Sequence, residues 1–158
     1  MSFLRVLLII ILTFIIQATI CPAFRIGAMC PSLLLILVVV LGIHFGIMQG
    51  GLLGAFIGLG VDVLSSASIG PYLFTYLICG ALAGTAAKKV YRQHWLTALL
   101  ITLGGTLMEG LVIGIWAGHG EFIWLTKSIL LPGLLYNGLV SVPVSLLIYQ
   151  FLKPSLTP

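Results

Sequence analysis

Long apolar runs separated by short polar breaks limit most strongly how this chain can fold. Nearly unbroken stretches of Leu, Ile, Val, Phe and Gly fill most of its 158 residues. Strands of membrane barrels alternate apolar and polar residues over about ten residues, and these runs do not alternate. Helices satisfy their backbone hydrogen bonds internally, and one membrane span needs about 20 apolar residues. The length therefore allows about six spanning helices joined by short connections.

The shortage of charge excludes most other classes of protein. Hydrophobic residues make up 61% of the chain and charged residues only 6%, whereas soluble domains carry about 25% charged residues. A soluble enzyme, a disordered tail and a nucleic-acid-binding domain are therefore excluded. The net charge of +4 comes from a few scattered basic residues and indicates no nucleic-acid partner. We expect one all-α integral membrane domain over residues 1–158, with the lipid bilayer as its solvent.

The breaks divide the chain into six expected helices. Their ranges are 3–20, 32–45, 51–64, 72–87, 95–117 and 128–152. The first run could be a signal peptide, but it is long for a signal core and no small-x-small cleavage site follows, so we favour a retained helix. The second and third runs are short for full spans, and a re-entrant pair is the alternative. Ser32 is expected to cap the second helix.

Basic residues indicate the orientation. Six spans place both termini on one side of the membrane, and the cytoplasmic side carries the excess of Lys and Arg. Five basic residues share the side of the termini: Arg5, Lys88, Lys89, Arg92 and Lys153. Two lie on the other side: Arg25 and Lys127. This split predicts that both termini are cytoplasmic.

Glycine recurs every four residues in the middle of the chain. The positions are Gly42, Gly46, Gly50, Gly54 and Gly58, followed by Gly80 and Gly84, and later by Gly110, Gly114 and Gly118. Small residues on one face let membrane helices approach closely, which is how such helices pair. The first run crosses a break in the chain, so it cannot form one continuous interface. It predicts either close packing inside the bundle or a groove for a partner's membrane helix.

Three polar residues stand inside the apolar runs: Asp62, Glu109 and Asn137. Charges at membrane depth are expensive and usually face the protein interior. We expect both carboxylates in the outer half of the membrane, where Arg25, Lys127 and Asn137 could lie nearby. The favoured interpretation is buried hydrogen bonding that fixes helix register. The alternatives are a proton path or cation site, and a contact with a partner.

Little in the sequence supports catalysis or a bound cofactor. The three histidines, His44, His94 and His119, lie in different loops or helix ends, so we expect no metal site. No nucleophile elbow, zinc-protease motif or phosphate loop is present. Cys21 and Cys30 flank one expected loop and could form a disulfide in an oxidising compartment, whereas Cys79 is expected in the core.

One ordered set of these features carries a family resemblance. It begins with the apolar stretch 31–39, a Pro-x-Leu-Leu-Leu helix, and continues through a glycine-rich helix to Asp62 and a turn. The positions after the first helix are Gly46, Gly50, Gly51, Gly54, Gly58, Asp62, Gly70, Gly80, Gly84, Asn137 and Pro143. This order resembles the MreD family of rod-shape-determining membrane proteins over the whole chain. The glycine–aspartate motif is its most specific part, and Glu109 has no assigned counterpart.

The resemblance implies a fold, a location and partners. It implies a six-helix bundle similar to the substrate-binding components of energy-coupling-factor (ECF) vitamin transporters, without catalytic activity or cofactor. It implies a place in the bacterial inner membrane, bound to MreC and supporting peptidoglycan elongation with RodA, its transpeptidase partner and MreB. Gly50, Gly54, Gly58, Asp62, Gly80 and Gly84 are the expected packing or partner-binding residues. The alternative function is the substrate-binding component of an ECF-type vitamin transporter.

Overall fold

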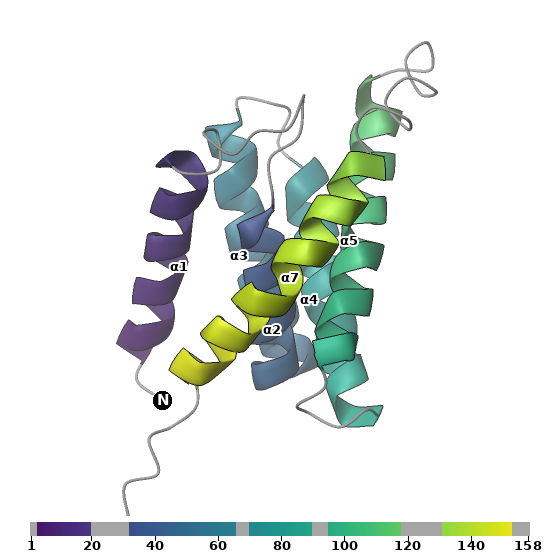
Figure 1. Cartoon of the computed structure of the whole chain (residues 1–158). Helices are drawn as coiled ribbons and strands as arrows, with labels where there is room; N and C mark the ends of the chain where they lie inside the picture. Colours follow the sequence, from purple (N-terminus) through teal and green to yellow (C-terminus); the bar gives the residue numbers. More distant parts are fainter. Residues whose placement is uncertain (1–2, 20–31, 66–69, 90–94, 118–130, 153–158) are drawn as a thin grey trace, which may run out of the picture.

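Six helices make up the described part of the chain. The computed structural model describes residues 3–19, 32–65, 70–89, 95–117 and 131–152. The helices are α1 (Phe3–Thr19), α2 (Leu33–Phe45), α3 (Ile47–Leu64), α4 (Pro71–Lys89), α5 (Trp95–Ala117) and α7 (Leu131–Leu152). Successive helices run in opposite directions, so α1 begins and α7 ends at the same end of the bundle, the lower end in Figure 1. The expected all-α fold class is confirmed.

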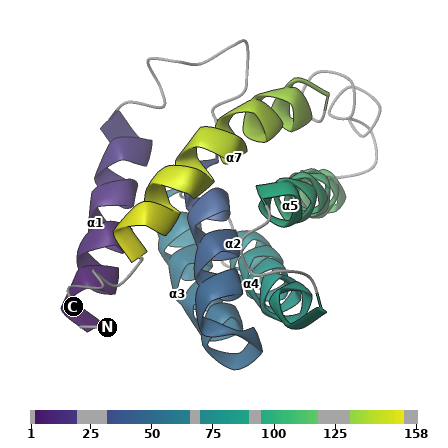
Figure 2. The same cartoon turned by 60° about the horizontal axis from the view of Figure 1, so that its bottom comes forward.

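The centre of the bundle is α2, which packs against all five of the other helices. Ten successive residues of α2, from Leu34 to Ile43, are buried. A helix that is apolar on every side has no preferred face, so it is stable only when neighbours surround it completely. Figure 2 shows α2 enclosed between α1, α3, α4 and α7. Its 13 residues span about 20 Å, less than the roughly 30 Å of a bilayer core.

The outer helices place apolar side chains outside and polar ones inside. Large hydrophobic side chains are exposed on α1, α3, α4, α5 and α7, with Leu139 78% exposed and Phe56 70% exposed. The buried polar residues are Asp62, Thr75, Thr102, Thr106, Asn137, Ser141 and Ser145. Water would penalise such a surface, whereas lipid tails are as apolar as leucine. The distribution of side chains is that of a protein dissolved in a bilayer.

Length and hydropathy test whether each helix could cross a membrane by itself. Among the described residues, one helix, α3, is both long and apolar enough to cross a membrane by that test alone. The remaining apolar segments are shorter, at Leu4–Thr19, Leu33–Phe45, Pro71–Ala86, Leu96–Val112 and Pro132–Ile148.

A single glycine separates α2 from α3. Gly46 has φ 89° and ψ −173°, a conformation that is essentially restricted to glycine. Its N–H donates to the Gly42 carbonyl, and its own carbonyl accepts from Gly50 N–H. The sequence predicted a break between the two helices at about residues 46–51. In the structure the break is the single residue Gly46. α3 begins at Ile47 rather than at the expected residue 51, because nothing in the run Ile47–Gly50 prevents a helix.

The other helix boundaries differ by a few residues from those expected. α4 extends to Lys89, two residues further than expected, and α2 begins at Leu33. α7 begins at Leu131, so Pro132 lies in its first turn, where proline's missing N–H leaves no bond unmade. Only Pro143 lies inside the helix. The expected start at residue 128 falls outside the described residues, as do Arg25, Lys127 and the pair Cys21 and Cys30.

Candidate functional site

Six glycines from three helices form the closest helix contacts in the bundle. We call them the glycine seam: Gly42 of α2, Gly50, Gly54 and Gly58 of α3, and Gly80 and Gly84 of α4. All six are buried, and α3 and α4 make the most extensive contact of any helix pair. The seam follows the four-residue spacing of the sequence, but it lies between helices and not along one.

Each glycine of the seam faces another helix's backbone. A Cβ on Gly54 would lie 2.8 Å from the carbonyl carbon of Tyr76, and one on Gly58 would lie 2.7 Å from Leu73 Cα. A Cβ on Gly80 would lie 2.8 Å from the carbonyl carbon of Gly50. Side chains cannot fit at such distances, and a backbone cannot move aside as a flexible side chain can. The seam is therefore a contact inside the bundle, and a partner helix could use it only by displacing α3 or α4.

Asp62 joins the end of α3 to the start of α4. Its side chain is completely buried. Oδ2 accepts from the backbone N–H groups of Gly70 and Leu73, and Oδ1 accepts from that of Tyr72, each at 3.0 Å. The first N–H groups of a helix lack partners within the helix, and their partial positive charge favours an anion. Asp62 therefore acts as the N-terminal cap of a neighbouring helix.

The first turn of α4 leaves no backbone donor unpaired. Pro71 has no N–H, Gly70, Tyr72 and Leu73 donate to Asp62, and Phe74 donates to the Gly70 carbonyl. Gly70 has φ 140°, where glycine is strongly favoured. A buried N–H left without a partner costs about 1–3 kcal/mol. The Asp62 carboxylate avoids that cost, because it accepts hydrogen bonds from three of these N–H groups.

Asn137 connects three further helices. Its Oδ1 accepts from the Ser32 N–H at 2.8 Å, and its Nδ2 donates to Thr106 Oγ1 at 3.0 Å. Thr106 in turn donates its hydroxyl to the Thr102 carbonyl within α5. The Ser32 hydroxyl lies 3.0 Å from the Tyr76 hydroxyl of α4. Asn137 is 3% exposed, so these bonds form away from water and fix the positions of α2, α5 and α7.

The start of α2 is capped by side chains of other helices. Ser32 occupies the capping position, but its side chain makes no capping bond, so that expectation was wrong. The Ser32 N–H donates to Asn137 and the Leu33 N–H donates to Gln17 Oε1 of α1 at 2.9 Å. Neither Gln17 nor Tyr76 was predicted from the sequence as a residue that joins helices. The available signal was weak: Gln17 is the one amide in the first apolar run.

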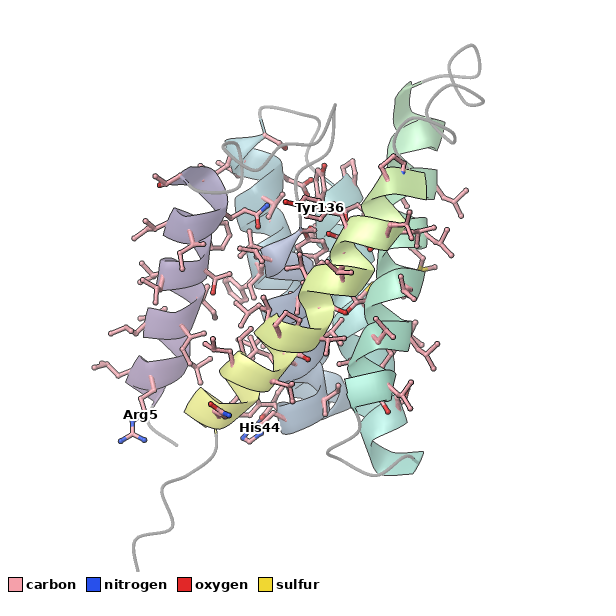
Figure 3. The ribbon with its side chains drawn as sticks, viewed as in Figure 1. Arg5, His44 and Tyr136 are labelled. Carbon is pink, nitrogen blue, oxygen red and sulfur yellow. The ribbon has the colours of Figure 1, made fainter. Side chains whose placement is uncertain are left out.

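Glu109 is the second acidic residue inside the apolar runs. It is half-buried on α5. Its charge acts on three side chains of α4: Tyr72, Tyr76 and Cys79. Cys79 is a free, buried core residue. Within the described residues, no group of three or more His, Cys, Asp or Glu side chains gathers in metal-binding proximity. Figure 3 places Tyr136, the neighbour of Asn137, near the upper end, and Arg5 and His44 at the lower end.

These contacts define an all-helical membrane protein in which buried Asp62 and Asn137 join helices to one another. The buried hydroxyls of Thr75, Thr102, Ser141 and Ser145 donate to carbonyls of their own helices, as membrane helices commonly do. The chain matches the family described as rod shape-determining protein MreD over residues 1–154, and it belongs to that family. It is thus a non-enzymatic membrane protein of rod-shape determination. No curated protein and no solved structure matches it.

Proposed function

We propose that this chain is a non-catalytic scaffold of the bacterial cell-wall elongation complex, which binds MreC within the membrane. The observation that carries the proposal is the family match over residues 1–154, nearly the whole chain. RodA, its transpeptidase partner and MreB would join through the same complex. The likeness to vitamin-transporter components stays a prediction, since no solved structure matches the chain.

The placement of polar and apolar groups supports a scaffold. Two interior polar groups are engaged within the bundle: Asp62 caps α4, and Asn137 bonds to Ser32 and Thr106. On the outside, the five described helices other than α2 expose large apolar side chains. In a membrane, such a surface can contact only lipid or the membrane helix of another protein. A partner with one membrane span could therefore pack on it.

Purification from native membranes tests the proposal. The tagged chain should recover MreC at an amount comparable to its own, and recovery should fail with a tag on an unrelated membrane protein of similar size. Recovery of ATPase subunits in place of MreC, together with stabilisation by a vitamin in a thermal-shift screen, would support a transporter component and overturn the scaffold. A purified MreC that does not bind the purified chain would contradict direct binding.

We further propose a multi-pass protein of the bacterial cytoplasmic membrane, with both termini in the cytoplasm. The structure puts the start of α1 and the end of α7 at one end of the bundle, and the five-to-two distribution of basic residues assigns that end to the cytoplasm. Single cysteines at Gln93 and Glu121, in a cysteine-free background, test this in intact cells. An impermeant reagent should label position 121 and leave position 93 unlabelled; the reverse pattern would invert the orientation.

A further inference from the structure

An open groove runs along the bundle between α1 and α7. Its volume is about 290 Å³. The walls include Leu8, Leu12 and Ile16 of α1 and Val144 and Leu147 of α7, and the α2 residue Leu33 also lines it. We call it the α1–α7 groove. Among the pairs of helices with extensive contacts, α1 is paired with α2, so no tight α1–α7 interface closes this space.

The side chains that line the groove offer no free hydrogen-bond donor to an occupant. Apart from Thr13, its lining consists of Leu, Ile and Val, and the Thr13 hydroxyl donates to the Ile9 carbonyl at 2.7 Å within α1. A polar ligand would lose its own hydration here without compensation. A hydrocarbon chain has no polar groups to desolvate, so an aliphatic chain is the occupant that suits these walls.

Arg5 lies on the same face of α1 as the groove. It precedes Leu8, Leu12 and Ile16 by three, seven and eleven residues, the spacing that aligns side chains along one side of a helix. Arg5 is exposed and stands at the lower end of α1, which is the end of the bundle where α7 also ends (Figure 3). One end of the apolar groove therefore carries a guanidinium group.

The distances along α1 match one leaflet of a bilayer. From Leu8 to Ile16 the helix rises about 12 Å, and from Arg5 to Ile16 about 16 Å. One leaflet contributes about 15 Å of hydrocarbon, half of the roughly 30 Å core. With the groove in the hydrocarbon layer, Arg5 lies at headgroup depth, where a guanidinium can bind phosphate oxygens in pairs.

We propose that the α1–α7 groove binds one acyl chain of an anionic phospholipid, whose phosphate is held by Arg5. The aliphatic walls suit the acyl chain, and the guanidinium at one end suits its phosphate, whereas an apolar helix of a partner would leave Arg5 without an anion. The lipid belongs to the leaflet that contains the N-terminus. The site does not depend on MreC binding, and either proposal can fail without the other.

Native mass spectrometry of the purified full-length chain tests the site, with phosphatidylglycerol and phosphatidylethanolamine offered together. The wild type should retain one phosphatidylglycerol in preference to phosphatidylethanolamine. Arg5→Gln should lower that preference about fivefold, the effect of one basic residue at a membrane surface. Lys89→Gln, the same change of charge at the end of another helix, should leave it unchanged.

A second pair of variants tests the acyl chain. Leu12→Trp should fill the groove and reduce retention of both lipids, whereas Ile11→Trp should not. The two residues are equally exposed, at 51% and 52%, but Ile11 does not line the groove. Equal thermal unfolding midpoints establish that both variants fold. Equal retention of the two lipids by the wild type, equal effects of Arg5→Gln and Lys89→Gln, or unchanged retention in a folded Leu12→Trp would each overturn the site.

Discussion

The glycine seam and the α1–α7 groove are both contacts between apolar helices, yet one is closed and the other open. In the seam, the Gly80 and Gly54 positions bring backbone against backbone. In the groove, Leu8 and Leu12 on one side and Leu147 on the other leave about 290 Å³ between them. The two regions differ in side-chain size, because the seam is made of glycines and the groove is lined mainly by Leu, Ile and Val.

This difference shows what holds membrane helices together. In water, burial of aliphatic surface would draw α1 onto α7, but in lipid that driving force is missing. Helices then associate only where their shapes or polar groups match. The helices of the seam match in shape. α1 is attached to α2 by the hydrogen bond from Leu33 N–H to Gln17, and to α3 by the Phe14 ring, which lies against Gly60.

Gly54→Leu should break the closed region and have the largest effect. The new side chain must displace the α4 backbone at Tyr76, so we expect a loss of about 3 kcal/mol or more, the upper end of overpacking costs. The measurement is thermal unfolding of the purified protein, with its amount in membranes. Gly104→Leu is the control, because a Cβ there has nothing within 4 Å. Equal stability of both variants would mean that the seam is not close-packed.

Asp62→Leu should have the next largest effect. It removes the acceptor from Gly70, Tyr72 and Leu73, and a buried donor left unpaired costs about 1–3 kcal/mol. Asp62→Asn keeps an acceptor oxygen that can serve two of the three donors, so it should lose less stability and still restore rod shape. Protein level and cell-shape complementation are measured together. An Asn variant that accumulates normally but fails to complement would show that the charge itself is needed.

Asn137→Leu should cost less, about 1 kcal/mol, because it leaves the Ser32 N–H and the Thr106 hydroxyl without that partner. Thr106→Val keeps the shape and removes two bonds, the one from Asn137 and the hydroxyl's own bond to the Thr102 carbonyl. The double variant measures the coupling, for which polar pairs in membranes average about 0.6 kcal/mol. Unfolding of the two single variants and the double variant, in one detergent, gives the three values. Strictly additive losses would show that the two side chains do not stabilise each other.

Much of this fold could be predicted from the sequence, because long apolar runs identify membrane helices. The apolar runs predicted the order of the six helices that the structure describes, and the glycine spacing predicted either close packing or a groove for a partner. The central place of α2 did not, because a helix without a polar face gives no indication of which side is buried. The break at Gly46 was blurred by glycines on both sides that serve packing.

Cross-helix capping was beyond the sequence for a different reason. The partner of the Ser32 N–H is Asn137, 105 residues away, and that of Leu33 is Gln17. No local pattern pairs such residues, because the pairing depends on which helices become neighbours. Asp62 was accessible because its partners follow within eleven residues, and the sequence already favoured buried hydrogen bonding at this residue.

Gly51→Ala should have the smallest effect and gives the sharpest comparison within the closed region. A Cβ on Gly51 would lie 3.5 Å from Ala81 Cβ, an ordinary contact, whereas one on Gly50 would lie 2.5 Å from Gly42 Cα. Ala also stabilises a helix by up to about 1 kcal/mol relative to Gly. We therefore expect Gly51→Ala to leave the unfolding midpoint unchanged or raised, and Gly50→Ala to lower it. Equal changes of the unfolding midpoint in Gly50→Ala and Gly51→Ala would contradict this. They would mean that close approach to α2 and α4 does not require glycine at position 50.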